Sequence, residues 1–122
     1  MKDLSELRIY LLAVEIGELG WQNVMSWDSF AKWTLGKQLV EYADGIAAQM
    51  IEGYYRKTRG EQRKFFLYSL SSAKESELWI WRARKRRLLS KKDYRSIKSK
   101  LEDLIPQTIN FILHLKRQKE GG

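Results

Sequence analysis

A run of cations between positions 82 and 100 is the part of this sequence best suited to binding chemistry. Ten Lys and Arg residues stand there against one acid, Asp93. Side chains at that density can neutralise several phosphates, which gives sequence-independent, salt-sensitive binding of nucleic acid, either RNA or DNA. The predicted nucleic-acid-binding residues are Arg82, Arg84, Lys85, Arg86, Arg87, Lys91, Lys92, Arg95 and Lys98.

The same run has blander interpretations. Its cations suit the C-terminus of a helix, so it could be a solvated face or a protein-binding surface. An acidic membrane surface is the least favoured partner, because the run lacks the apolar face of an interfacial helix. We favour nucleic acid, since the net charge of the run exceeds what helix capping needs.

Three carboxylates, Glu52, Glu75 and Glu77, resemble a catalytic or metal-binding set. A dinuclear carboxylate site in a helical bundle needs Glu-x-x-His on two helices, and no Glu here has a His three residues later. We therefore expect Glu52 and Glu75 to pair with nearby cations such as Arg56. The single histidine, His114, fits a structural role near a helix C-terminus. With no cysteine either, the sequence predicts no metal, no cofactor and no enzyme.

The tryptophans bear on assembly. Trp79 and Trp81 are two residues apart, which separates them by about 200° on a helix, so both cannot face one core. One must lie at the surface, in an intersubunit contact or against nucleic acid. The excess of apolar perimeter favours a homo-oligomer over a monomer.

Apolar spacing indicates that helices position these residues. Steps of three and four recur from Trp33 to Tyr54 and from Tyr94 to Leu115, and no window has a sustained period of two. The first segment repeats through Leu4, Leu7, Leu11 and Val14, with further apolar residues widening the arc, and the third repeats through Phe66, Leu70, Ala73 and Ile80. The fold class is therefore all-α: an antiparallel, up-down-up-down four-helix bundle with helices over residues 4–19, 30–57, 61–87 and 91–119.

Local residues indicate where these helices begin and end. Gly17 and Gly20 are expected to end the first helix. Thr58 with Glu61 and Ser90 with Asp93 have the spacing of capping boxes. Pro106 falls inside the last helix and predicts a kink rather than a break.

The whole chain has 122 residues and a net charge of +8, which suits one domain, residues 1–119, with a frayed tail at 120–122. Residues 1–55 carry four Lys and Arg against eight Asp and Glu, so the end of the fold away from the basic run is expected to be mildly acidic. No apolar run is long enough to cross a bilayer and no basic leader precedes an apolar stretch, so we expect a cytoplasmic protein.

Four segments, taken together, resemble one protein family. They are ADGIAAQMIEGYYR at 43–56, preceded by GKQL at 36–39 and followed by Phe65, Ser72, Glu75 and Glu77, then by RARKRRLLS at 82–90. In this order and spacing they resemble the 23S rRNA intervening-sequence four-helix-bundle proteins, over about residues 4–116. The chain departs from the pattern at Gln49, Ile51 and Tyr55, where the family usually has Asn, Ala and Gly.

The resemblance implies a four-helix bundle that assembles into a ring, commonly a pentamer. A related branch, the accessory variability proteins of diversity-generating retroelements, comprises basic pentamers that bind nucleic acid and a reverse transcriptase. We therefore expect a non-catalytic basic scaffold that binds nucleic acid where the third helix meets the fourth. The alternative is an adaptor that docks a reverse transcriptase or another protein without touching nucleic acid.

Overall fold

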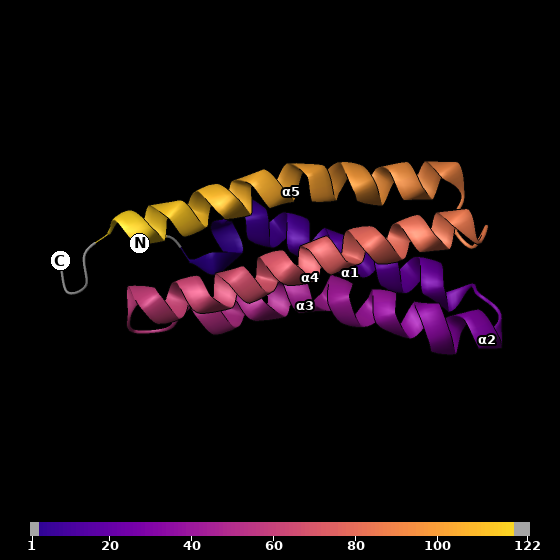
Figure 1. Ribbon diagram of the computed structural model, residues 1–122, viewed down its shortest axis with the longest axis horizontal. Coiled ribbons are helices and arrows are strands. Elements are labelled where there is room, and N and C mark those ends of the chain that lie inside the picture. Colours follow the sequence, from indigo (N-terminus) through magenta and orange to yellow (C-terminus); the bar gives the residue numbers. More distant parts are fainter. Residues whose placement is uncertain (1–2, 119–122) are drawn as a thin grey trace.

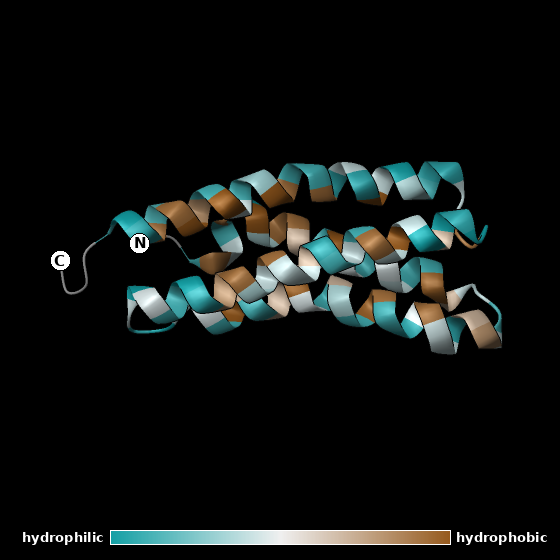
Figure 2. Ribbon diagram, in the orientation of Figure 1, coloured by the Kyte–Doolittle hydropathy of each residue, from teal (hydrophilic) through white to brown (hydrophobic). Residues whose placement is uncertain are grey.

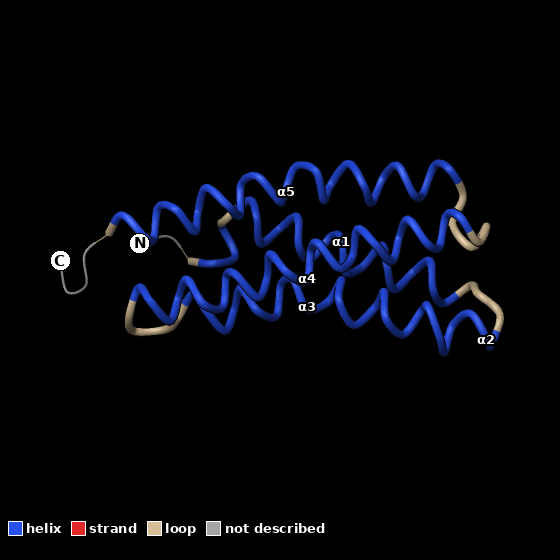
Figure 3. The backbone as a smooth tube through the Cα atoms, in the orientation of Figure 1, coloured by secondary structure: helices blue, strands red, loops and turns tan. Residues whose placement is uncertain are grey.

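The computed structural model describes residues 3–118, and within that range the chain is built almost entirely of helices (Figures 1 and 3). A short 3-10 turn, η1 (Leu4–Glu6), leads into α1 (Arg8–Met25). The chain continues through α2 (Ser29–Ala31), the π-helical turn η2 (Lys32–Gly36) and α3 (Lys37–Tyr54), then α4 (Arg59–Lys85) and α5 (Lys91–Arg117). Residues 3–118 contain no strand. The predicted all-α, antiparallel four-helix bundle is confirmed.

The helices follow one another around the bundle in chain order. Helix α1 packs against α3 and α5, and α4 packs against α3 and α5, so α1 and α4 lie diagonally opposite. Figure 1 shows the turn between α4 and α5 at one end of the bundle, together with α2. The turn between α3 and α4 lies at the other end, together with the C-terminal end of α5. None of the described helices is long and apolar enough to span a membrane.

The second helix is continuous but changes register near its start. Asp28 caps it by accepting a hydrogen bond from the backbone N–H of Ala31, and η2 then makes one wide π turn before α3 begins. A π turn adds a residue to the helical cycle and rotates what precedes it. Leu35 and Leu39 are therefore buried, while Trp33 is 73% exposed. The prediction that Trp33 belongs to the core seam is wrong.

The remaining seams are mostly as expected. Phe66, Ala73 and Ile80 of α4 are buried, as are Leu101 and Leu104 of α5. Figure 2 shows the hydrophobic residues of each helix interrupted by hydrophilic ones, as an amphipathic helix requires. In α1 the prediction that Leu11 and Val14 face the core is wrong. The buried residues of α1 are Ile9, Leu12, Ala13 and Ile16, whereas Leu11 and Val14 are exposed.

The first helix also runs past its expected end. Gly17 and Gly20 are buried in its interior, where they allow close approach to α3. A Cβ at Gly17 would lie 2.8 Å from Oδ1 of Asp44, and one at Gly20 would lie 3.5 Å from Cβ of Ala43. These glycines are packing positions and not helix terminators.

The predicted N-caps of α4 and α5 are present. The Thr58 hydroxyl accepts a hydrogen bond from the N–H of Glu61, and the Ser90 hydroxyl accepts one from Asp93, each at 3.1 Å. Pro106 lies inside α5, which continues through it (Figure 1). The predicted end of the last helix at Lys119 and the predicted tail, 120–122, lie outside the described residues.

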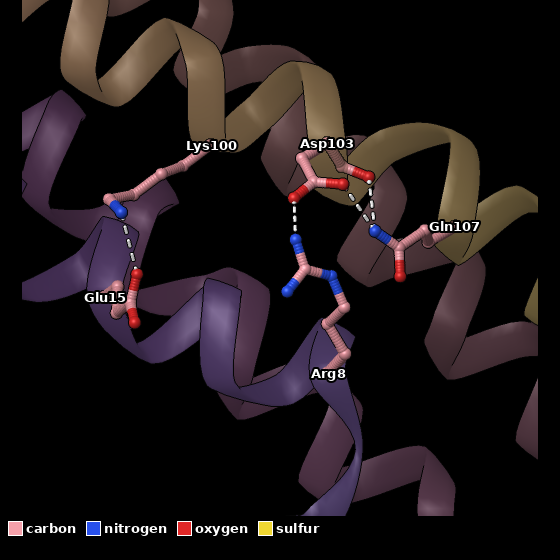
Figure 4. A network of polar contacts seen from close by, with 5 residues as sticks. All are labelled: Arg8, Glu15, Lys100, Asp103 and Gln107. Atoms are coloured by element: carbon pink, nitrogen blue, oxygen red, sulfur yellow. Dashed lines mark hydrogen bonds and ion pairs between the residues drawn. The ribbon is translucent and has the colours of Figure 1, made fainter.

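Ion pairs join α1 to α5 along one side of the bundle. Figure 4 shows Arg8 paired with Asp103, whose other oxygen accepts a hydrogen bond from the side-chain amide of Gln107. One turn further, Nζ of Lys100 lies 2.9 Å from Oε2 of Glu15. The side chains of both pairs are partly solvent-exposed, so each pair contributes little to the stability of the fold.

Candidate nucleic-acid interface

The basic run surrounds the tight connection between α4 and α5. The end of α4 closes with the hydrogen bonds of a Schellman motif: the N–H of Leu88 donates to the carbonyl of Ala83 at 2.8 Å, and that of Arg87 donates to Arg84 at 3.1 Å. Side-chain Nη1 of Arg84 also donates to the carbonyl of Leu89, at 3.2 Å. The side chain of Arg84 thus bridges the two ends of the turn, and the neighbouring cations project from the turn.

Arg87 occupies the left-handed position of this motif. Its φ is 62°, and among the described non-glycine residues it alone has a positive φ. Glycine is the usual residue there, because an L side chain in this conformation costs about 1–2 kcal/mol. The fold would therefore be served better by glycine, yet an exposed cation stands at this position.

Lys91 and Lys92 are also placed against the preference of the fold. They are the first two residues of α5, directly after its N-cap Ser90. The N-terminus of a helix carries a partial positive charge and favours acids, so each lysine there is unfavourable by about 0.3–1 kcal/mol. The capping interpretation holds for Arg82, Arg84 and Lys85 in the last turn of α4, but it does not explain Lys91 and Lys92.

The nine predicted residues are therefore grouped at one end of the bundle, and we call them the basic corner: Arg82, Arg84, Lys85, Arg86, Arg87, Lys91, Lys92, Arg95 and Lys98. Seven of these side chains are exposed, and Arg82 and Arg84 are half-buried. Among the described residues, none of the nine forms an ion pair with a carboxylate. Lys100, the next cation along the chain, is instead paired with Glu15. The hydrophilic end of α4 and α5 is visible in Figure 2.

Several cations of the basic corner lie over aromatic rings. The guanidinium of Arg82 lies 5.1 Å from the ring centroid of Trp79, and Nζ of Lys98 lies 5.7 Å from that of Tyr94. Such contacts orient the long side chains without neutralising their charge. The corner therefore presents cations that form no ion pair within the described chain.

A shallow hollow beside the basic corner was not predicted. Phe30, Thr34, Arg86 and Leu88 are among the residues that line it, with a volume of about 250 Å³. Phe30 is 79% exposed. It belongs to the second helix, 56 positions before Arg86, so only the fold places its ring beside the basic corner.

The opposite end of the bundle is not simply acidic, contrary to the expectation from the first 55 residues. Figure 1 shows the α3–α4 turn and the end of α5, which carry cations, at the same end as η1, which carries an acid. Several of these cations have partners: Arg56 pairs with Glu52 at 2.8 Å, and Arg59 donates to the side chain of Gln62 at 2.7 Å. Charges of both signs occur at this end because the acidic N-terminal segment lies there together with the basic α3–α4 turn and the basic end of α5.

Tyr55, one of the departures from the family pattern, also lies at this end. Its hydroxyl donates a hydrogen bond of 2.7 Å to Oδ1 of Asp3. This bond lowers the pKa of the Asp3 carboxyl and raises the pKa of the Tyr55 hydroxyl. The tyrosine thus links the N-terminal segment to the end of α3.

The alternative chemical candidates do not assemble into a site. Glu52 pairs with Arg56 as predicted, whereas Glu75 has no ion pair among the described residues. Within residues 3–118 no group of three or more histidines and carboxylates could hold a metal ion. His114 is exposed and contacts Gln118. Of the two tryptophans, Trp79 is partly buried and Trp81 is 49% exposed, so they do diverge as predicted.

A solved structure shares this fold. The crystal structure of a protein of unknown function from the S23 ribosomal protein family of Bacteroides thetaiotaomicron superposes with a TM-score of 0.77. The match covers 85% of this chain and 97% of that one, at 16% sequence identity, which establishes likeness of fold alone. No curated protein matches the sequence.

The sequence itself matches a family model. The model of the 23S rRNA-intervening sequence protein family matches residues 5–110, which include all of α1, α3 and α4 and most of α5. The four segments that carry the resemblance all lie inside this range, and the fold is the bundle they predict. The chain therefore belongs to the 23S rRNA-intervening sequence protein family.

Proposed function

We propose that this protein is a non-catalytic scaffold that binds nucleic acid through the basic corner, as a homo-oligomer. The observation that carries the proposal is the state of the nine cations: they share one end of the bundle, and no carboxylate of the described chain pairs with them. Unpaired cations grouped on this scale form the electrostatic footprint of a phosphate-binding surface.

The placement of individual cations supports binding over simple solvation. Arg87 stands where the backbone favours glycine, and Lys91 and Lys92 stand where a helix favours acids. A residue that opposes the preference of the fold is expected where it serves another function. These three positions therefore favour phosphate contacts over a solvated face.

The structure also limits the mode of recognition. No helix end or strand of residues 3–118 projects from the bundle as a reading element for the major groove (Figure 3). Lysines and arginines around a turn contact phosphates, which position a nucleic acid without reading its sequence. We expect binding that is nearly indifferent to base sequence.

A charge reversal separates binding from folding. In the variant Lys91→Glu/Lys92→Glu, each new carboxylate interacts favourably with the N-terminus of α5, so the fold should gain about 0.3–1 kcal/mol per site. Affinity for nucleic acid should nevertheless fall by tenfold or more at about 0.1 M salt, because two phosphate contacts are replaced by repulsion. Fluorescence anisotropy with a labelled oligonucleotide measures the affinity, and thermal unfolding measures the stability.

The matched control is Lys57→Glu/Lys64→Glu, which makes the same change of net charge at the opposite end of the bundle. This control should bind nearly as tightly as the parent. Equal weakening by both variants would show that net charge, and not the basic corner, governs binding. If neither variant differs from the parent, the basic corner is a solvated face, and the adaptor that docks a reverse transcriptase or another protein becomes the better proposal.

Oligomerisation would add to this binding. A pentamer is our first expectation, from the family resemblance, and exposed apolar side chains such as Trp33 and Trp21 support an assembly of some kind. Repeating the basic corner in several copies would raise affinity through multivalency. Light scattering at tens of micromolar protein tests the assembly, and a monomer mass would contradict it.

A further inference from the structure

The shallow hollow beside the basic corner is built from two parts of the chain that are distant in the sequence. Asp28, Phe30 and Thr34 line it from the beginning of the second helix, and Arg86 and Leu88 line it from the α4–α5 turn. Figure 1 shows α2 and this turn at the same end of the bundle. The hollow has a volume of about 250 Å³, which is enough to admit one planar base of a nucleic acid.

The ring of Phe30 is free to contact a ligand in this hollow. Phe30 is 79% exposed, the largest exposed fraction among the large hydrophobic residues of the described chain. Within residues 3–118, no other aromatic ring and no cation lies against its ring. A single exposed aromatic residue is common on protein surfaces. An exposed ring beside a group of cations is, however, the arrangement that binds single-stranded nucleic acid, because bases stack on the ring while the cations contact the phosphates.

Hydrogen bonds hold the chain in place on both sides of the hollow. On one side, the hydroxyl of Thr34 donates to the backbone carbonyl of Phe30 at 2.6 Å. On the other side, the backbone N–H of Leu88 donates to the carbonyl of Ala83 at 2.8 Å, as part of the Schellman motif. A ligand in the hollow therefore meets a surface that needs little further ordering, which lowers the entropy cost of binding.

The charges of the hollow favour a neutral base inside it and phosphates at its edge. Arg86 lines the hollow and forms no ion pair with any described residue. Asp28 also lines it, and Oδ1 of this carboxylate accepts a hydrogen bond from the backbone N–H of Ala31 at 3.0 Å. A carboxylate repels a phosphate but not a neutral base. The phosphates of a bound strand should therefore contact Arg86, and the base should lie against Phe30.

We infer that the hollow receives one unpaired base of a single-stranded nucleic acid, which stacks on Phe30 while the flanking phosphates contact Arg86 and the rest of the basic corner. The inference rests on the proposed function and names the class of nucleic acid that this surface takes. In a duplex each base is already paired and stacked, so a duplex can use the phosphate contacts alone. Every base has a face that can stack, so the site should tolerate any base sequence.

A nucleotide matches the lining of the hollow better than a segment of protein does. Each nucleotide carries one negative charge and one flat neutral ring, and the hollow offers one cation, Arg86, and one exposed ring, Phe30. A protein segment would need an acidic and an apolar side chain at this spacing, and further acids for the other cations of the basic corner. If a protein segment is the true occupant, affinity for nucleic acid will not depend on Phe30.

The variant Phe30→Ala removes the ring and keeps every cation. Phe30 is exposed and alanine is a strong helix former, so helical content by circular dichroism and mass by light scattering should match the parent. Its affinity for a labelled single-stranded oligothymidylate of about 12 nucleotides should fall by about 5- to 100-fold, the loss that removal of one base–aromatic stack gives. Phe30→Trp should keep the parent affinity, because an indole ring also stacks on a base.

An abasic strand of the same length separates the contribution of the bases from that of the phosphates. It carries the same phosphates without bases, so the parent should bind it about as weakly as Phe30→Ala binds oligothymidylate. The substitution should then cause no further loss with the abasic strand. A duplex of the same length should also bind the parent and Phe30→Ala equally. Oligouridylate provides the RNA arm, and a loss of affinity with one strand type alone would show which of the two the hollow takes.

Tyr68→Ala is the matched control, because Tyr68 is another exposed aromatic residue, in the half of α4 away from the basic corner. It should bind every probe as the parent does. If Phe30→Ala binds oligothymidylate as tightly as the parent, or if the parent does not distinguish the abasic strand, the inference is overturned while phosphate binding by the basic corner stands. If the parent binds no probe, the proposed function fails and the inference fails with it. A changed mass of Phe30→Ala would also overturn the inference, since the hollow would then be a contact between copies.

Discussion

The substitution Arg87→Gly isolates the cost of holding a cation in the left-handed position of the α4–α5 turn. The φ of Arg87 is 62°, which costs an L residue about 1–2 kcal/mol and costs glycine almost nothing. Glycine loses more entropy on folding, and this offsets about 0.5–1 kcal/mol of the gain. The net expectation is a stabilisation of about 0.5–1 kcal/mol.

Thermal unfolding in about 1 M salt is the appropriate assay. At that ionic strength the Debye length is about 3 Å, so the lost interaction of Arg87 with the C-terminus of α4 contributes little. The expected rise in Tm is about 2–5 °C for a chain of this size. At low salt the same variant should bind nucleic acid more weakly than the parent, because one cation of the basic corner is gone.

Arg87→Ala is the matched control, since alanine also loses the charge but keeps a Cβ in the left-handed conformation. It should not raise Tm. If alanine and glycine raise Tm equally, the gain does not come from the left-handed backbone, and the argument from backbone conformation fails.

Other predictions follow from the packing of the bundle. Gly53→Ala should destabilise by about 1–3 kcal/mol, because the new Cβ would lie 2.8 Å from Cβ of Phe65; Gly60→Ala, with only the Arg63 guanidinium within 4.0 Å, should instead stabilise by up to about 1 kcal/mol, and chemical denaturation compares the two. Leu104→Asp places a carboxylate in a fully buried position and should abolish the cooperative thermal transition in circular dichroism, whereas a parent-like transition would contradict the assigned core. The raised pKa of Asp44 means that the folded chain holds this proton more tightly than the unfolded chain, so stability is lost as pH rises from about 3.9 through the folded pKa. Asp44→Asn should therefore raise Tm at pH 7 and should lose that advantage below about pH 4.

Local sequence patterns predicted the second half of the fold better than the first. Helices α4 and α5 have caps, Thr58 and Ser90, whose hydroxyls act within three residues, and their seams contain Ala73 and Leu104 as expected. Helix caps and the spacing of buried apolar residues depend on residues close together in the sequence, so the sequence pattern predicts them. Helix α5 ends at Arg117, where the cap residue Gln118 is extended, two positions before the predicted end at Lys119.

The errors in the first half have tertiary causes. Glycine lowers helix propensity, so Gly17 suggested a helix end, but its lack of a Cβ allows α3 to approach. Apolar residues surround most of α1, and spacing alone could not decide whether Leu11 or Leu12 faces the core. The π turn at η2 shifts the register by one residue, which exposed Trp33.

The basic corner was predictable as a composition but not as a surface. The sequence shows the cluster of cations, and the short connection between the last two predicted helices indicates that they share one end of the bundle. The left-handed Arg87, the turn-holding role of Arg84 and the nearness of Phe30 depend on coordinates. Lys100 pairs with Glu15, which lies 85 positions away in the sequence. The sequence therefore could not predict that Lys100 is paired while the cations of the basic corner are not.

The salt dependence of nucleic-acid affinity tests the central claim most directly. Phosphate binding predicts that log affinity falls linearly with log salt, with a slope of about −0.9 per neutralised phosphate on duplex DNA. Between about 50 and 200 mM salt, the slope for Lys91→Glu/Lys92→Glu should be shallower than that of the parent by about 2, one unit for each lost contact. The control Lys57→Glu/Lys64→Glu should keep the parent slope. A parent whose affinity does not change with salt, or equal slopes for the parent and the Lys91→Glu/Lys92→Glu variant, would contradict nucleic-acid binding by the basic corner.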